Sequence, residues 1–387
     1  MKLANRMGKL GTETAFVVLA KAKALEAQGK DVIHLEIGEP DFDTPKNIRE
    51  AAKRALDEGY THYGPSAGFP AFREVIAQEI SKRWGVSVTP EQVVVTPGAK
   101  PIMFFAILAL INSGDEVIYP NPGFPIYESV INLVGANPVP ILLREENDFE
   151  MDIQELRDKI TSKTRMLIIN SPGNPTGSVL SKTNVEAIAE IIRGKEIMVL
   201  SDEVYHRILY EGEHHSIFSV PGMQEQTILL NGFSKTYAMT GWRLGFGVMR
   251  EDLAQKIAQL MTNSNSCTSS FTQMAGIEAL QGPQDEVDRM VAEFRRRRQV
   301  IVEGLNAIDG ISCKKPKGAF YVFPNVKEIG WNCGKLADYF LEKAGVAVLS
   351  GLSFGQFGDG YLRLSYANSV ENIQKSLERI RDAIAAI

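Results

Sequence analysis

The sequence predicts an α/β fold in which helices cover a mainly parallel sheet, with a smaller α+β domain beside this large domain. Three observations predict it. Short apolar runs alternate with amphipathic stretches between residues 45 and 282. Each apolar run leads into a polar or Gly/Pro-rich cluster, as strands do where they enter loops. After Gln281-Gly-Pro283 a long charged stretch replaces this alternation, which marks a change of domain.

Each apolar run is expected to form a buried strand, because strands covered on both faces read as continuous apolar runs. The expected strands are residues 92–95, 116–119, 165–169, 197–200 and 226–230. Amphipathic patterns between many of them are expected to form helices at residues 45–59, 71–84, 101–111 and 181–193. Such alternation of strands and helices is typical of a parallel sheet. Ligands of these sheets bind at the carboxyl ends of the strands, where the polar clusters lie.

The second domain is expected to begin with a charged helix from Asp285 to about Ile308, followed after Gly318–Phe323 by shorter elements. The residues up to about Thr44 precede the first helix of the large domain, so we assign them to the small domain as well. The predicted division is residues 45–282 for the large domain, and residues 1–44 with 283–387 for the small one.

Composition describes a folded protein of 387 residues with 44% hydrophobic and 23% charged residues. The formal net charge of −5 argues against a nucleic-acid partner, which usually requires a basic face. The one dense basic run, Arg295–Arg298, lies in the charged helix and is interpreted as a solvated face. No apolar stretch has the length of a membrane span, and the first residues lack the apolar core of a signal peptide. We therefore expect no membrane partner.

Three widely spaced cysteines match neither a disulfide framework nor a zinc site. They indicate reduced thiols in a cytoplasmic protein. The five histidines show no spacing typical of metal ligands, so no metal site is expected.

The most informative window runs from Gly232 to Gly245 and contains a lysine directly after a strand, with an arginine eight positions later. Lysine amines form imines with aldehydes once burial or nearby cations favour the neutral amine. Arginine offers a fork of donors to phosphate oxygens. Lys235 and Arg243 together suit an aldehyde cofactor that carries a phosphate. The alternative is a surface lysine and an arginine at the edge of the core.

This window resembles the lysine signature of class I and II pyridoxal-phosphate-dependent aminotransferases, which have fold type I. The resemblance covers nearly the whole chain, and Leu35–Phe42 and Asn170–Gly177 are similar to the bacterial and archaeal aspartate-aminotransferase branch. It implies pyridoxal 5'-phosphate as the cofactor and a seven-stranded, mostly parallel sheet in the large domain. It also implies a small domain formed from both chain ends, and a homodimer with shared active sites.

The resemblance also implies roles around the cofactor ring. Lys235 would form the Schiff base and carry the proton, with Asp202 and Tyr205 as the other catalytic residues. Asp202 would hold the pyridine nitrogen protonated, which strengthens the ring as an electron sink. Tyr205 and Asn174 would hydrogen-bond the ring hydroxyl. As sequence alone, Asp202 also suits a helix N-cap, and the turn around Asn174 is only a loop signal.

The segment Thr96-Pro-Gly-Ala-Lys100 leaves backbone amides open at the start of a helix, which suits a phosphate. By resemblance, Ala99 and Lys100 hold the cofactor phosphate together with Arg243. Tyr63 would reach the phosphate of the neighbouring subunit. Phe124 stands where the family has an aromatic side chain stacked on the ring, often Trp in this branch. The alternative for Phe124 is a core aromatic.

An arginine lies inside the apolar strand Tyr361–Tyr366, and a buried arginine needs an anion. By resemblance, Arg363 grips the substrate α-carboxylate, with Gly38 and Asn174 beside it; the alternative is an internal salt bridge. Lys100 would meet the distal carboxylate of an acidic substrate, or would only add positive field near the phosphate. The stretch Ala15-Phe16-Val17 makes the pocket more apolar than an acidic substrate favours.

The resulting hypothesis is an aminotransferase that moves an amino group between an L-amino acid, with aspartate or glutamate favoured, and a 2-oxo acid such as 2-oxoglutarate. Alanine, aromatic or other neutral amino acids are the alternative substrates. A β-lyase or a cyclopropane-forming synthase would use the same cofactor residues, so cofactor motifs do not separate them from an aminotransferase. An aminotransferase-like regulatory domain would carry an additional basic DNA-binding domain, and none is visible here.

Overall fold

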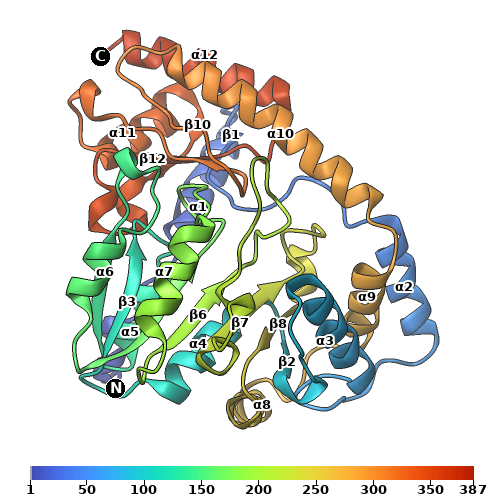
Figure 1. Cartoon of the computed structure of the whole chain (residues 1–387). Coiled ribbons are helices and arrows are strands. Elements are labelled where there is room, and N and C mark those ends of the chain that lie inside the picture. The colour runs from blue at the N-terminus through green and yellow to red at the C-terminus, as the bar shows by residue number, and fades with distance from the viewer. Residues whose placement is uncertain (1) are drawn as a thin grey trace.

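The computed structural model describes residues 2–387, and a seven-stranded sheet forms its centre (Figure 1). The strand order is β2-β8-β7-β6-β5-β3-β4. The strands are β2 (Val93–Thr96), β3 (Glu116–Asn121), β4 (Asn137–Leu142), β5 (Thr164–Asn170), β6 (Met198–Asp202), β7 (Thr227–Gly232) and β8 (Gly245–Val248). All neighbours pair in parallel except β8, which is antiparallel to both β2 and β7. The mostly parallel, seven-stranded sheet is therefore confirmed.

The five expected strands are all present, whereas the expected ranges did not include β4 and β8. Strand β4 lies at one edge of the sheet and contains Pro138 and Pro140. Proline is tolerated on an edge strand because no partner needs its missing N–H on that side. Strand β8 contains two glycines among four residues, which hides its apolar character.

Helices cover both faces of the sheet. The four expected helices are present as α2 (Lys46–Asp57), α3 (Pro70–Trp84), α4 (Lys100–Leu110) and α7 (Lys182–Ile192). The sequence analysis did not identify α5 (Ile126–Leu133), α6 (Ile153–Lys159), α8 (Glu251–Ser264) and α9 (Ser270–Gln281). Alternate residues of one strand enter different cores: Val117 of β3 packs with α4, α5 and α8, whereas Ile118 packs with α6 and α7. This is the two-sided burial that the continuous apolar runs predicted.

Both chain ends build the smaller part of the molecule. Strand β1 (Ile33–His34) pairs in parallel with β10 (Val346–Ala347). A second small sheet contains β11 (Leu349–Ser350), β12 (Leu362–Ser365) and β9 (Tyr321–Val322). Helices α1 (Thr14–Glu26), α10 (Asp285–Asn306), α11 (Cys333–Tyr339) and α12 (Val370–Ala385) pack around them (Figure 1). The α+β part made from both ends is thus confirmed, and the boundaries at residues 44/45 and 282/283 stay predictions.

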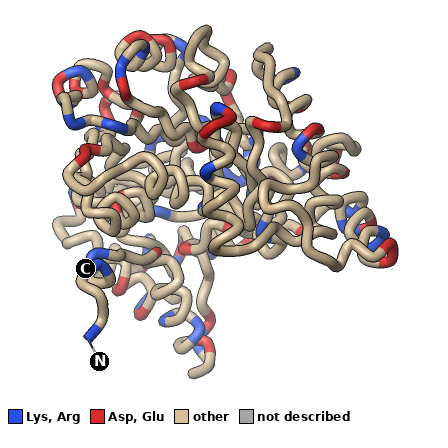
Figure 2. The backbone as a smooth tube through the Cα atoms, turned by 90° about the horizontal axis from the view of Figure 1, so that it is seen from below, with Lys and Arg blue, Asp and Glu red and all other residues tan. Residues whose placement is uncertain are grey.

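The charged helix α10 corrects one expectation. Figure 2 shows basic and acidic residues interspersed along the backbone. The basic run of α10 is not a solvated face throughout. Arg297 and Arg298 are only 6% and 4% exposed. Arg297 pairs with Asp41 at 2.6 Å and with Glu293 at 3.0 Å, and Arg298 pairs with Glu211 at 2.9 Å. Two of the four arginines therefore fasten α10 to neighbouring segments, because the helix turns them inward.

Among residues 2–387, no helix combines the length and the apolar character that crossing a membrane requires.

Candidate active site

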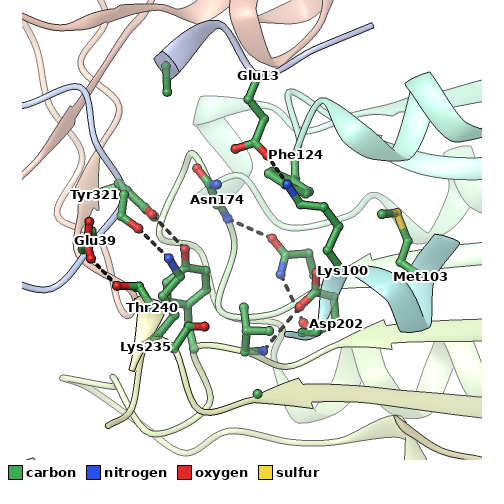
Figure 3. A pocket seen from close by; sticks show the side chains of 18 of the residues that line it. Glu13, Glu39, Lys100, Met103, Phe124, Asn174, Asp202, Lys235, Thr240 and Tyr321 are labelled. Atoms are coloured by element: carbon green, nitrogen blue, oxygen red, sulfur yellow. Dashed lines mark hydrogen bonds and ion pairs between the residues drawn. The ribbon is translucent and has the colours of Figure 1, made fainter. Parts of the chain in front are cut away.

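A cavity of about 490 Å³ lies at the carboxyl ends of the central parallel strands (Figure 3). Ten of the eleven residues that the sequence analysis assigned to cofactor or substrate binding line it: Gly38, Ala99, Lys100, Phe124, Asn174, Asp202, Tyr205, Lys235, Arg243 and Arg363. The eleventh, Tyr63, does not. The fold thus brings residues from both chain ends and from the sheet to one place, where a parallel sheet usually binds its ligand.

Lys235 follows the end of β7 and is buried in the cavity wall. Its Nζ donates a hydrogen bond to the carbonyl oxygen of Gly38 at 2.5 Å. Burial lowers the pKa of Lys235 to about 8, against the opposing charges of Glu39 and Glu13. A sizeable fraction of this amine is therefore neutral near pH 7 to 8, as a nucleophile or a general base requires.

Asp202 is the last residue of β6 and is buried, with only neutral partners for its carboxylate. The Tyr127 hydroxyl donates to Oδ2 at 2.6 Å, and the Val204 amide donates to Oδ1 at 3.3 Å. Burial raises the pKa of Asp202 to about 6. A cationic group in the cavity would lower that pKa and stabilise the carboxylate, so the site suits a protonated ring nitrogen.

Asn174 supplies a polar atom that lacks a partner. Its backbone amide donates to Asn170 Oδ1 at 2.9 Å, and Asn170 Nδ2 donates to the Asp202 carbonyl at 3.1 Å. This network holds Asn174 above the end of β6 (Figure 3). Within residues 2–387, the buried Oδ1 of Asn174 accepts no hydrogen bond. Buried acceptors without a donor are rare and costly, so this atom fits a ligand hydroxyl.

Tyr205 is buried in the same wall, and its hydroxyl lies 2.8 Å from the Tyr321 hydroxyl. Phe124 lines the cavity and packs edge-on against Tyr127, with ring centroids 5.6 Å apart. An aromatic face and a hydroxyl pair around Asp202 form a slot for a flat polar ring. This agrees with Phe124 as a cavity residue rather than a residue of the closed core.

The predicted phosphate site is an open cradle. Helix α4 begins at Lys100 with Ala99 as its N-cap, so the first amides of the helix have no helical acceptor. Gly98 has φ of +89°, and a Cβ there would overlap the Arg243 guanidinium. Arg243 donates only to the carbonyls of Thr240 at 2.9 Å and Pro97 at 3.4 Å and has no carboxylate partner within residues 2–387. A free cation beside open helix amides fits a phosphate.

Arg363 lies in β12 and is only 3% exposed. In the described part of the chain it forms no ion pair; one terminal nitrogen donates to the Glu36 carbonyl, and Nε has no partner. Its guanidinium carbon lies 4.6 Å from the Tyr321 ring centroid and 5.2 Å from that of Phe354. The internal salt bridge considered above is therefore absent among residues 2–387. A buried guanidinium flanked by aromatic rings fits a carboxylate from a ligand.

Gly38 lies against Tyr321, and a Cβ at this position would overlap the Tyr321 hydroxyl. A glycine here therefore leaves room for the Tyr321 hydroxyl while its carbonyl accepts from Lys235. Tyr63 is 89% exposed and lies outside the cavity. Its contribution to a neighbouring subunit's phosphate site stays a prediction.

Sequence reasoning missed several residues of the cavity wall and its support, among them Glu13, Tyr127, Asn170 and Tyr321. Tyr127 follows Phe124 by three residues and lies in the first turn of α5, six residues after the end of β3, so its position near a strand end was a usable signal. Tyr321 lies in a segment that only its apolar pattern had marked. Glu13 had no local signal, because its partner Lys100 is 87 residues away.

Comparison with known proteins agrees with this geometry. A family model described as aminotransferase class I and II matches residues 30–380. A Pyrococcus horikoshii protein named aspartate aminotransferase is 46% identical over 92% of this chain and 91% of its own length. A Thermococcus litoralis protein named aromatic-amino-acid aminotransferase 2 is 40% identical, covering 92% and 93%. The solved structure of aspartate aminotransferase from Thermus thermophilus with maleate has a TM-score of 0.95 at 38% identity, covering 99% and 100%.

Proposed function

The chain belongs to the class I and II aminotransferases and is therefore a transaminase, and we propose that it uses pyridoxal 5'-phosphate to exchange the amino group of an L-amino acid with a 2-oxo acid. Aspartate and glutamate are the favoured donors, and 2-oxoglutarate is the matching acceptor. The observation that carries the proposal is the set of three buried ionisable groups in one cavity. Lys235 has a pKa lowered to about 8, Asp202 has only neutral partners, and Arg363 has no anion within residues 2–387.

The residues of the cavity fit the cofactor. Asp202 would face the ring nitrogen, Tyr205 and Asn174 the ring hydroxyl, and Phe124 the face of the ring. The phosphate would lie in the cradle of Ala99, Lys100 and Arg243. When bound, pyridoxal 5'-phosphate supplies an aldehyde for covalent capture of amines and a ring that accepts electrons.

The chain's own residues then orient the substrate and move its proton. Arg363 and the Gly38 amide bind the α-carboxylate, which fixes the α-carbon relative to Lys235. The Lys235 amine would take the proton from the substrate α-carbon at Nζ and would donate it again to complete the transfer of the amino group. A base with a pKa of about 8 is matched to this task near neutral pH. Asp202 would hold a negative charge beside the ring nitrogen of the bound cofactor and so keep that nitrogen protonated.

The preference for acidic substrates is supported by Lys100 at the cavity wall and by the Thermus thermophilus structure with maleate, which is a dicarboxylate. An aromatic or other neutral substrate is the second candidate. It is supported by Ala15 and Phe16, which also line the cavity, and by the relative named aromatic-amino-acid aminotransferase 2.

The active unit of this proposal is a cytoplasmic homodimer. The highly exposed Tyr63 is available to complete the phosphate site of a second copy. The three cysteines form no disulfide in the described chain, which accords with a reducing compartment.

Chemical trapping tests the proposal. Purified protein with cofactor should be yellow, and borohydride should bleach it and leave the cofactor covalently on Lys235, as peptide mass mapping would show. Lys235→Ala should still bind cofactor through the phosphate cradle and lose transamination almost completely. Label on another lysine would overturn the assignment. A transaminase converts the amino donor into its 2-oxo acid and leaves the acceptor aminated. Release of pyruvate together with free ammonia, without amination of an acceptor, would identify a lyase.

A further inference from the structure

Lys100, the cation expected to meet the distal carboxylate of an acidic substrate, already has a partner in this structure. Its Nζ forms an ion pair with Oε1 of Glu13. Figure 3 shows Glu13 extending from the start of α1 toward Lys100, with Phe124 beside the pair. The side chains are 45% exposed for Lys100 and 21% exposed for Glu13. Both residues line the cavity that contains Lys235 and Arg363.

Glu13 therefore presents the same chemical group that an acidic substrate would present. A carboxylate on Lys100 neutralises the ammonium, whether it belongs to the chain or to the substrate. Two carboxylates at one ammonium repel each other, since like charges a few ångströms apart interact unfavourably even near a protein surface. An acidic substrate must then displace the Glu13 carboxylate from the Lys100 ammonium. A neutral substrate leaves the pair intact and meets an uncharged wall.

Little in the structure holds Glu13 in place apart from Lys100. It occupies the N-cap position of α1 without a side-chain capping bond. Helix α1 contributes a single fully buried residue, Ala22, while Phe16 and Val17 are 61% and 48% exposed. Segments with few buried apolar contacts open at low free-energy cost. The start of α1 can thus withdraw Glu13 when a competing carboxylate arrives.

We propose that Glu13 is a specificity-determining residue. Its carboxylate pairs with Lys100 in place of a substrate carboxylate, and a dicarboxylic substrate displaces it. The inference rests on the proposed transaminase function and adds its substrate class: one cavity accepts both dicarboxylic and apolar amino acids. Glu13 neutralises Lys100 for the apolar ones, and Phe16 of the same segment supplies apolar surface beside them. This arrangement gives one site the two substrate types that Lys100 and the apolar Ala15-Phe16-Val17 stretch indicate separately.

Half-reaction kinetics of the holoenzyme test the proposal. The cofactor absorbance is followed with aspartate, glutamate, alanine and phenylalanine for the wild type and Glu13→Gln. Loss of the competing carboxylate should raise kcat/KM for the acidic pair about two- to five-fold, the upper part of the range for a partly exposed ion pair. It should lower kcat/KM for alanine and phenylalanine about two- to five-fold, because Lys100 is then unpaired beside an apolar side chain. The acidic-to-neutral ratio is the measured quantity, since it cancels general damage.

Two further variants sharpen the result. Glu39→Gln removes a second carboxylate of the cavity wall, whose partner is Thr240 rather than Lys100, and should change the ratio no more than about two-fold. In a Lys100→Met background, Glu13→Gln should no longer shift the ratio, because the two residues act as a pair. An unchanged ratio in Glu13→Gln, or the same shift with Lys100→Met, overturns the inference. A wild type without transamination on any amino acid overturns the proposed function instead.

Discussion

Burial shifts the pKa of the three charged groups central to the proposed chemistry: it lowers those of Lys235 and Arg363 and raises that of Asp202. Each charged form is destabilised because the protein supplies no full partner for it. The same lack of a partner leaves room for a ligand with complementary charges. At the scale of residues, the site is therefore less stable when it holds no ligand than a site with satisfied groups would be.

Asp202 allows this cost to be measured. In the cofactor-free protein its pKa is about 6, above the ordinary 3.8, so the folded state binds the proton more tightly than the unfolded state. The resulting destabilisation is complete above pH 6 and is lost as the pH falls toward 3.8. We expect Asp202→Asn, which accepts the Tyr127 hydrogen bond without a charge, to stabilise the cofactor-free protein by about 1–3 kcal/mol at pH 7.5.

Thermal unfolding at pH 7.5 and pH 4.5 checks this expectation, and the gain should shrink by more than half at the lower pH. Transamination should fall sharply in the same variant, because the neutral amide cannot keep a ring nitrogen protonated. A gain that is equal at both pH values would mean that Asp202 is not the group responsible.

Helix α10 shows how one element fastens the loop that carries Gly38. Arg297 pairs with Asp41, three residues beyond Gly38, and lies 4.9 Å over the Phe42 ring. Removing one member of a buried pair leaves the other charge without compensation. Because Asp41 and Glu293 remain partly exposed, we expect Arg297→Met to lower the free energy of unfolding by about 2–3 kcal/mol.

The matched control is the preceding residue. Arg296 pairs with the same Glu293 but is 60% exposed, so Arg296→Met should cost less than about 1 kcal/mol. Denaturant unfolding of both variants measures the difference. A rise of KM for amino acids in Arg297→Met alone would show that the loop carrying Gly38 depends on this pair. Equal costs for the two arginines would mean that the buried pair adds nothing.

At this scale the sequence predicted most of the large domain, and the gaps have physical causes. The strands buried on both faces read as apolar runs, whereas β4 is interrupted by Pro138 and Pro140 and β8 by two glycines. Several motif residues of the site were predictable because they lie at or just after the end of a strand, as Asp202 and Lys235 do, or open a helix, as Lys100 does. Arg363 was predictable because it is a lone charge inside an apolar strand. Glu13 was not, since only the tertiary fold brings it to Lys100. The inward turn of Arg297 and Arg298 likewise depends on segments far along the chain.

At the scale of the whole molecule, the prediction concerns the assembly of two copies with shared active sites. If Tyr63 completes the site of a second copy, each active site contains Lys235 from one subunit and Tyr63 from the other. Lys235→Ala and Tyr63→Ala then remove residues that different subunits contribute to the same site. A mixed dimer then contains one site with both defects and one site with neither. Random mixing of equal amounts makes half of the dimers mixed, so about a quarter of the wild-type activity should appear from two nearly inactive parents.

Activity after mixing and subunit exchange is the measurement, with each parent alone as the baseline. A mixture of Lys235→Ala with Asp202→Asn is the control, because both residues lie in the same wall of one chain and no mixed dimer restores a site. Activity no greater than the sum of the parents would show that Tyr63 acts within its own chain or not at all.

During synthesis, strand β1 can pair with β10 only after the ribosome has made the other end of the chain. His34 accepts a hydrogen bond from Asn368, 334 residues later, and Ile33 and Leu35 are buried among side chains from α10, β12 and α12. A ribosome adding about 5–20 residues per second needs roughly 20–70 seconds to cover that distance. For this whole interval the nascent chain carries an apolar segment near its start without its native cover. Arg363, the residue proposed to bind the substrate carboxylate, can reach the Glu36 carbonyl only near the close of synthesis, so this part of the cavity wall forms last.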